Sequence, residues 1–353
     1  MSNAASVFLC PFGLIYRGVV QLRNALFERH LFRAWQSPVP VVSIGNLTAG
    51  GTGKTPLVDL IVKYCLSIGC KPAIVSRGYL RQSKGVQLVS DGQRVLLGSR
   101  AAGDETAMLA WNNPDAIVVV AEKRREGVEF IIRKFKGRVP GVIILDDAFQ
   151  HRQIARNLDI AIINAREPFA KAKMLPEGRL REPLKNLARA DLILLGKVTD
   201  EERALDMQKE LEKTGRPVLK ARLKTGELVC FSGAFKTPDD APPPESLSVL
   251  AFAGIASPQS FLESLKSKGV NIAATRSFRD HEPYTASKLK AVRQEAEKKG
   301  LSLVTTEKDY FRLLGTPELL TIITPLPCYY LKIETEIYEG LDTLHTMLRE
   351  AVG

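Results

Sequence analysis

Residues 45–56, GNLTAGGTGKTP, have the residue types of a loop that binds phosphate groups. The usual pattern places a glycine and four further residues before Gly-Lys-Ser/Thr, and here that first position is Thr48. Glycines allow backbone N–H groups to approach phosphate oxygens closely. The Lys54 ammonium could reach the outer phosphates, and the Thr55 hydroxyl could ligate Mg²⁺. We therefore predict a nucleotide site formed by Thr48, Gly50, Gly51, Thr52, Gly53, Lys54 and Thr55.

A second candidate for chemistry is VIILDD, residues 142–147, an apolar run that ends in Asp146 and Asp147. A buried strand that ends in acids commonly supplies the carboxylate that holds Mg²⁺ in enzymes with a phosphate-binding loop. Side chains alternate along a strand, so the two carboxylates point to opposite sides and the pattern leaves open which one contacts the metal. The alternative is that these acids cap a following helix.

Two further groups could act on a substrate hydroxyl. Asp104 and Glu105 in GDET, residues 103–106, either cap the helix that follows or place Asp104 as a general base. Asp280 and His281 lie in FRDHEPY, residues 278–284, between a predicted strand and a predicted helix. A lone histidine is more often structural than catalytic, and the residues alone leave both alternatives open.

Composition narrows the range of partners. The chain has 353 residues and a net charge of +11, from 50 basic and 39 acidic residues, which favours an anionic partner. It has no pattern of an RNA-recognition sheet and no zinc-finger spacing, so we expect no nucleic acid partner. The five cysteines are scattered, without a Cys-x-x-Cys pair, which indicates neither a zinc site nor a disulfide framework.

The N-terminal segment, residues 1–35, combines apolar residues at helical spacing with four arginines. Its first apolar stretch is interrupted by Pro11 and Gly13 and is too short to span a bilayer. One interpretation is a helix that packs on the core. The other is a helix that lies in the headgroup region of a membrane, and this is the one we adopt.

The elements that must position these residues alternate between strands and helices. A β-branched run at 39–46, the glycine loop, a helical pattern at 56–69 and a strand at 71–79 follow in order. Further buried strands are predicted at 115–121, 141–149, 158–165 and 190–198, and two strands around a turn at 224–226. This alternation predicts an α/β fold with a doubly wound parallel sheet, like that of P-loop NTPases.

The predicted organisation has four parts. The phosphate loop belongs to a P-loop domain over residues 36–235, which follows the N-terminal helix of residues 1–35. A segment rich in proline and acids, 236–246, reads as a linker. A second, smaller α/β domain over 247–353 would close over the cleft.

Taken together, the motifs resemble the tetraacyldisaccharide 4′-kinase family, the lipid A 4′-kinases of Gram-negative bacteria. The matching stretches occur in the order of the family and cover nearly the whole chain: GNLTAGGTGKTP, SRGY (76–79), GDE (103–105), DDAFQH (146–151), LPEGRLREPL (175–184), AGIASPQSF (253–261), FRDHEPY and TTEKDYFRL (305–313). Two positions depart from the family pattern, Ala148 where glycine is usual and Glu177 where a smaller alanine is expected.

The resemblance implies transfer of the γ-phosphate of ATP to the 4′-hydroxyl of tetraacyldisaccharide 1-phosphate, which forms lipid IVA in lipopolysaccharide biosynthesis. It implies an anionic glycolipid substrate, ATP and Mg²⁺, and a peripheral position on the cytoplasmic face of the bacterial inner membrane. Site residues carry over as follows: Lys54 and Thr55 with ATP and Mg²⁺, Asp104 as the base paired with His281, Glu105, Asp146 and Asp147 around the metal, and Arg77, Arg181 and Glu182 lining the cleft.

The phosphate loop is also compatible with two other classes of protein. A partner-regulated ATPase or GTPase also uses a Gly-Gly-x-Gly-Lys-Thr loop, but such proteins often carry an extra lysine where this chain has Ala49. The stretches around Lys197 and Lys308 lack the spacing of a guanine-reading motif. The second rival, a lipid-surface binding module without catalysis, would not need Asp104 or His281.

Overall fold

The structure is a computed structural model, and it describes residues 3–167, 172–231, 242–243, 246–280 and 282–353. Twelve strands form one sheet in the order β10-β9-β11-β12-β8-β7-β6-β1-β5-β2-β4-β3. The strands are β1 Val41–Asn46, β2 Pro72–Ser76, β3 Gln87–Asp91, β4 Ile117–Val120, β5 Val142–Asp146, β6 Leu158–Asn164, β7 Leu192–Gly196, β8 Val218–Cys230, β9 Ser248–Ala253, β10 Asn271–Ser277, β11 Ser302–Thr306 and β12 Cys328–Glu339.

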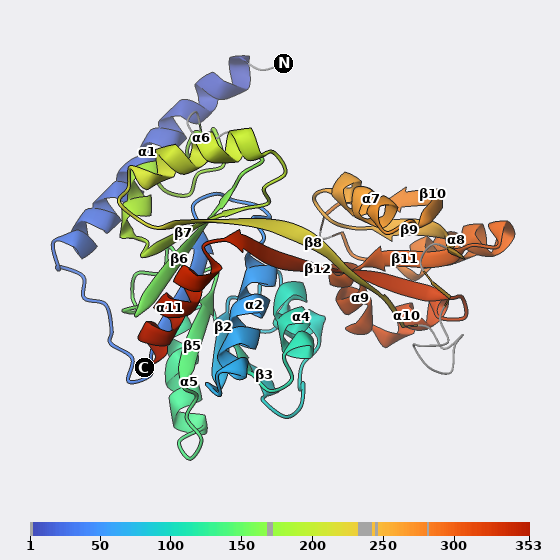
Figure 1. Ribbon diagram of the computed structural model, residues 1–353, viewed down its shortest axis with the longest axis horizontal. Helices are drawn as coiled ribbons and strands as arrows, with labels where there is room; N and C mark the ends of the chain where they lie inside the picture. The colour runs from blue at the N-terminus through green and yellow to red at the C-terminus, as the bar shows by residue number, and fades with distance from the viewer. Residues whose placement is uncertain (1–2, 168–171, 232–241, 244–245, 281) are drawn as a thin grey trace.

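Helices cover the sheet in two groups, which Figure 1 shows as two units of different size. They are α1 Asn3–Glu28, α2 Lys54–Ser67, α3 Ser99–Ala102, α4 Asp104–Asn112, α5 Arg124–Lys134, the 3₁₀ helix η1 Leu184–Arg189, α6 Glu201–Glu212, α7 Pro258–Ser267, α8 Ala286–Lys299, α9 Glu307–Leu314, α10 Pro317–Ile323 and α11 Leu341–Val352.

The first unit contains the strands from β7 to β3, and all pair in parallel except β3 at the edge. Alternate side chains of one strand pack into the hydrophobic cores on opposite faces of the sheet. Ile144 of β5 packs with α2, whereas Ile143 and Leu145 pack with α5. Both faces are therefore buried, as a continuous apolar strand in a parallel sheet requires. This confirms the predicted doubly wound α/β fold.

The second unit repeats this design on a smaller scale. Strands β10, β9, β11 and β12 pair in parallel. On one face Phe252 of β9 packs with Leu289 of α8, and on the other Ala251 packs with Phe261 of α7. The smaller α/β unit anticipated after the proline-rich segment is present, although residues 236–241 and 244–245 of that segment lie outside the described residues.

A long antiparallel ribbon of β8 and β12 connects the units (Figure 1). The first residues of β8 pair with β7, and its remainder pairs with β12 from Lys220↔Glu339 to Cys230↔Tyr329. The predicted turn at 224–226 is therefore wrong. Lys224 and Thr225 lie inside one strand, because they pair with Glu334 and Ile333 from a distant part of the sequence.

The C-terminal end of the chain returns to the first unit. Leu344, Leu348 and Ala351 of α11 lie in the core cluster that also contains β1 and α2 residues. The structure thus differs from the predicted second domain of 247–353, since its last helix belongs to the other unit. An apolar helix face at the end of the chain does not indicate which of two cores it completes.

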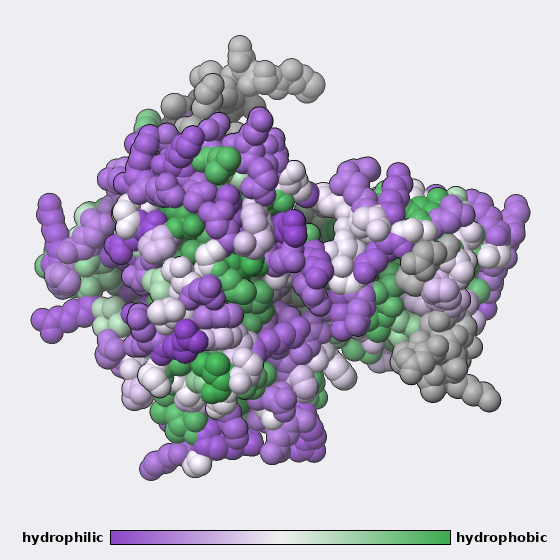
Figure 2. Space-filling view, viewed as in Figure 1, coloured by the Kyte–Doolittle hydropathy of each residue, from purple (hydrophilic) through white to green (hydrophobic). Residues whose placement is uncertain are grey.

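The helix α1 lies along the outside of the first unit (Figure 1). Four of its apolar side chains, those of Leu14, Ile15, Val19 and Leu22, are between 61% and 65% exposed, and we call them the apolar stripe. The face of the molecule drawn in Figure 2 is mostly hydrophilic. Among the described residues, no helix has both the length and the apolar content needed to cross a bilayer.

Candidate active site

The phosphate loop joins β1 to α2. Gly50 and Gly53 have φ angles of 116° and 88°, which residues other than glycine rarely adopt. Gly53 directly precedes the first turn of α2. Lys54 is the first residue of that helix, and its ammonium donates a hydrogen bond to Asn46 Oδ1 at 3.2 Å. The loop thus presents a helix N-terminus and a cation on one site, which suits phosphate.

A second chain segment clamps the start of this loop. Ala49 N donates to the carbonyl of Arg179 at 2.7 Å, and Thr48 forms an antiparallel bridge with Leu180. This explains the unusual Thr48, because a residue in an extended bridge needs no positive φ. The Arg179 guanidinium lies over Gly50, where a Cβ would come within 1.8 Å of it. Any side chain at position 50 would displace that arginine.

The two adjacent acids have different environments. Asp146 is only 6% exposed and accepts a hydrogen bond from Ser76 Oγ at 2.8 Å. Asp147 has a positive φ of 49° and pairs with Arg181 at 3.0 Å and with Lys54 at 3.5 Å. The structure therefore brings Lys54, Asp146, Asp147 and Arg181 together at the end of β5.

These environments shift the pKa values of the two carboxyl groups in opposite directions. Burial, and secondarily the charge of Asp147, raises the pKa of Asp146. Burial by itself would raise the pKa of Asp147 as well, but the charges of Lys54 and Arg181 lower it below its usual value. A buried acid beside a second acid would be stabilised in its charged form by a cation.

Asp104 and Glu105 form a second cluster where the two units meet. Asp104 Oδ2 accepts a hydrogen bond from Arg312 Nε at 2.9 Å, and Glu105 pairs with Lys308 at 2.9 Å. Both cations come from α9, and Lys308 also lies 3.6 Å from Asp280. The N-cap residue of α4 is Gly103 and no side chain makes a cap hydrogen bond, so the helix-cap alternative is wrong; the two acids lie in the first turn of α4, where negative charge is favourable.

The loop after β2 links the two clusters. Ser76 contacts Asp146, while Gly78 and Gly103 pack backbone to backbone, so that a Cβ on Gly103 would meet the Tyr79 carbonyl at 2.9 Å. Arg77 is exposed between these contacts. The SRGY and GDE motifs are thus neighbours in space, although they are more than twenty residues apart in the sequence.

Glu182 and His281 have other positions. Glu182 is 1% exposed and binds Arg23, Asn24, Asn186 and Arg189, so it holds α1 and η1 to the core behind the site rather than lining an open cleft. His281 lies outside the described residues, and its predicted pairing with Asp104 stays a prediction.

Comparison with known proteins places this geometry in a family. The family model of tetraacyldisaccharide-1-P 4′-kinases matches residues 5–352. The chain belongs to the tetraacyldisaccharide 4′-kinase family. The tetraacyldisaccharide 4′-kinase of Pelodictyon phaeoclathratiforme is 66% identical over 353 residues, covering 100% of this chain and 99% of the relative. That of Chlorobium chlorochromatii is 64% identical, covering 100% and 95%.

A solved structure of the family extends the match to three dimensions. The crystal structure of LpxK from Aquifex aeolicus in complex with ATP has a TM-score of 0.77 and 29% identity, and the match covers 98% of this chain and 99% of the other. The resemblance stated from the motifs is therefore confirmed over both units of the fold.

Several residues that contact the candidate site residues have no signal in the sequence. They are Asn46 beside Lys54, Ser76 beside Asp146, Lys308 beside Glu105 and Arg312 beside Asp104. No local signal could have identified them, because each is defined by a partner from another element. Lys197 is a further example: its ammonium donates to the carbonyl of Gly51 at 2.6 Å, within the phosphate loop.

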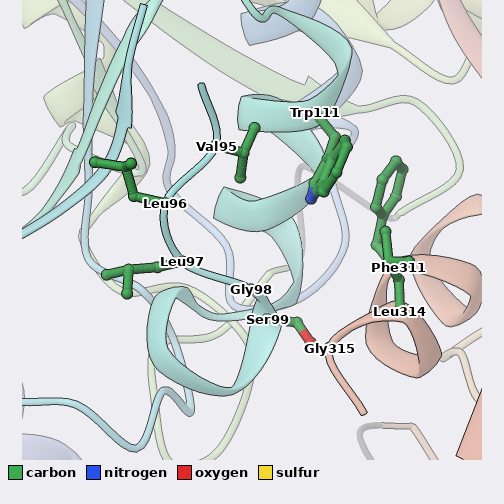
Figure 3. A pocket seen from close by; sticks show the side chains of 9 residues that line it. All are labelled: Val95, Leu96, Leu97, Gly98, Ser99, Trp111, Phe311, Leu314 and Gly315. Carbon is green, nitrogen blue, oxygen red and sulfur yellow. The ribbon is translucent and has the colours of Figure 1, made fainter. Parts of the chain in front are cut away.

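A cavity of about 240 Å³ lies on the same seam between the units (Figure 3). Its lining includes Trp111 of α4 from the first unit and Phe311 of α9 from the second. Its other lining residues are Val95, Leu96, Leu97, Gly98, Ser99, Leu314 and Gly315. None of the lining residues belongs to the phosphate loop or to the two acidic clusters, so the cavity is separate from the candidate site.

Proposed function

We propose that this protein transfers the γ-phosphate of ATP to the 4′-hydroxyl of tetraacyldisaccharide 1-phosphate and so makes lipid IVA for lipid A biosynthesis. The observation that carries the proposal is the match of a 4′-kinase family over the whole chain, with an intact phosphate loop. The relatives bear the name of this kinase, and the Aquifex aeolicus structure is a complex with ATP. A phosphotransferase with an alcohol acceptor needs a nucleotide site and a base for the hydroxyl proton, and candidates for both are present.

In the proposed reaction Asp104 accepts the proton of the 4′-hydroxyl. The hydroxyl oxygen attacks the γ-phosphorus, the bond to the bridging β–γ oxygen breaks, and ADP leaves. Lys54 and the N–H groups of residues 50–55 stabilise the charge on the phosphates. Arg181 lies beside Asp147 and Lys54, so it is placed to contribute further positive charge. Arg77, exposed between the two clusters, and His281 complete the site in this proposal.

The residues present also fit Mg²⁺. The described residues contain no group of three or more His, Cys, Asp or Glu that could hold a metal by themselves. Mg²⁺ usually binds through one or two carboxylates together with substrate phosphates and waters. Asp146 is a buried acid with a raised pKa next to the phosphate loop, which suits this donor set. We propose that Thr55, Asp146 and Asp147 would hold the ion. The ion would neutralise negative charge on the phosphates. Glu105, which pairs with Lys308, would lie near the ion without contacting it.

We further propose that α1 holds the enzyme on the cytoplasmic face of the inner membrane. Its exposed stripe, Leu14, Ile15, Val19 and Leu22, offers apolar surface. Arg17 of α1, and Arg29 and Arg33 just after it, are exposed and offer charge to anionic headgroups, whereas Arg23 pairs with Glu182. An anionic glycolipid substrate would be met at such a surface.

A phosphate-transfer assay tests the reaction. The protein in detergent is mixed with γ-labelled ATP, Mg²⁺ and tetraacyldisaccharide 1-phosphate, and the lipid product is separated. We expect label on the lipid, lost by roughly a hundredfold or more in Asp104→Ala. Asp206→Ala, on the exposed side of α6, should act like the wild type. ATP hydrolysis without labelled lipid, stimulated by a protein partner, would favour the regulatory ATPase instead.

Flotation with vesicles tests the membrane proposal. Vesicles that contain anionic phospholipids should carry the wild type upward in a density gradient, and the double substitution Val19→Asp/Leu22→Asp should weaken this binding. Leu205→Asp, which also replaces an exposed leucine but on α6, is the matched control and should not. Equal flotation of all three proteins would contradict the role of α1.

A further inference from the structure

The helix α9 of the second unit carries two cations on one face. Lys308 and Arg312 are four residues apart, so they lie on the same side of the helix. They meet Glu105 and Asp104, the first two acids of α4 in the first unit, each at 2.9 Å. The candidate base is therefore contacted from the opposite unit.

Arg312 is fixed from its own side as well. Its Nη1 donates to Asp309 Oδ1 at 3.0 Å and to the carbonyl of Gly254 at 3.3 Å, and its guanidinium lies 5.8 Å from the centre of the Tyr284 ring. Asp309 is fully buried and accepts from Gly254 N at 2.9 Å and from Thr306 Oγ1 at 2.7 Å. A guanidinium held by these contacts has little freedom to turn away from Asp104.

The charges favour a permanent pair. Burial by itself would lower the pKa of Arg312, but Asp309 and Asp104 raise it above its ordinary value, so the guanidinium stays charged. The titratable and charged groups around Asp104 in the described part of the chain are Glu105 on α4, Lys308, Asp309 and Arg312 on α9, Asp280 before α8, and Tyr284. Of these, Arg312 is the cation with a direct hydrogen bond to the Asp104 carboxylate.

We infer that Arg312 is a positioning residue for the acceptor base: it fixes one oxygen of Asp104 from the second unit and so orients the carboxylate. This rests on the proposed role of Asp104. The reaction then depends on α9 through Asp104, because a base that turns away from the hydroxyl cannot accept its proton. Phosphate binding at Lys54 does not depend on this contact.

The test measures kcat and KM for Arg312→Ala in the labelled-lipid assay. We expect kcat to fall roughly tenfold to a hundredfold, while KM for ATP changes less than about threefold, because phosphate binding does not use this contact. Arg312→Lys should recover part of kcat, and added guanidinium should partly restore Arg312→Ala.

Arg276→Ala is the matched control, since it removes an arginine of the same unit that pairs with Glu295 at the surface. It should keep the wild-type kcat and KM and gain nothing from guanidinium. An Arg312→Ala enzyme with the wild-type kcat would overturn the inference, and so would an absence of rescue by both lysine and guanidinium. If Arg312→Ala does not fold, kcat and KM are measured for Arg312→Gln instead.

Asp104→Ala, measured in parallel, separates this inference from the proposed function. Full activity in Asp104→Ala would refute the assignment of the base itself. An inactive Asp104→Ala beside an Arg312→Ala enzyme with the wild-type kcat would refute only the role of Arg312.

Discussion

At the scale of single residues, Gly103 is the position on which the placement of Asp104 depends. It has φ 85° and ψ 150°, a region of backbone geometry open almost only to glycine, and it packs against Gly78 and the Tyr79 carbonyl. Since Asp104 is the next residue, any shift of this backbone moves the candidate base directly.

We therefore predict that Gly103→Ala lowers kcat by roughly tenfold or more and destabilises the fold by about 2–4 kcal/mol. Gly69→Ala is the control, because Gly69 also has a positive φ, 77°, but has open space around its Cβ position. It should cost only about 1–2 kcal/mol and leave kcat unchanged. Urea unfolding and the transfer assay measure both quantities, and equal effects of the two variants would contradict the argument.

His151 gives a residue-scale prediction about pH. Burial, followed by the charges of Arg124 and Arg77, lowers the pKa of His151 to about 4. In the unfolded chain the pKa of this histidine is about 6.5. Between pH 4 and pH 6.5, roughly, the unfolded chain binds a proton that the folded chain does not, so the stability of the fold falls as the pH falls.

The wild type should lose at most about 1 kcal/mol between pH 6.5 and pH 5.5 through this residue. His151→Gln should show a shallower dependence in the same window, measured by urea unfolding at each pH. His345→Gln keeps His151 and should keep the wild-type slope; a steeper slope in His151→Gln would contradict the assignment.

At the scale of elements, Glu182 connects α1 to the rest of the first unit. Its buried carboxylate receives Arg23 at 3.1 Å and Asn24 at 3.2 Å from α1, and Arg189 at 2.8 Å from η1. Tyr16 of α1 adds a hydrogen bond to the carbonyl of Arg181 at 3.0 Å. One acid therefore fixes the orientation of α1, and with it the apolar stripe.

Glu182→Gln should destabilise the protein by about 2–4 kcal/mol, because it leaves two arginines next to a neutral group. Hydrogen exchange in α1 should also be faster in the variant than in the wild type, and exchange in β1 should change less. Glu28→Gln, which affects only the exposed pair with Arg152 at 3.8 Å, should change stability by less than about 0.5 kcal/mol. Unchanged exchange in α1 would show that Glu182 does not hold it.

At the scale of the whole molecule, the chain leaves the first unit through β8 and returns through β12 and α11. The second unit is therefore an insertion into the first rather than an appended domain. The first unit is complete only when the last helix, beyond the second unit in sequence, has docked on it.

Leu348→Ala should accordingly destabilise the first unit by about 2–4 kcal/mol, since Leu348 is fully buried in its core. Exchange protection should fall in β1 and α2 more than in β9 and α8. Leu341→Ala, at a leucine that is 37% exposed on the same helix, is the control and should cost less. Loss of protection confined to the second unit would contradict this account.

The sequence was informative where the chemistry is local. A glycine loop before an amphipathic helix, and strands with apolar residues on both faces, specify a phosphate site and a doubly wound sheet from contiguous residues. The acids of GDET and of β5 were found in the same way, because each ends or begins an element. The ordered motifs then identified the family.

Tertiary structure decided everything that depends on partners distant in the chain. The local sequence predicts a turn at Lys224 and Thr225, but their pairing with β12 makes them part of a strand. Glu182 read as a cleft residue, but burial beside Arg23 makes it an anchor for α1. Arg312 had no local signature, since its importance lies in a contact with Asp104 from 208 residues away. Local pattern fixes how a segment folds, whereas long-range packing determines which side chains meet.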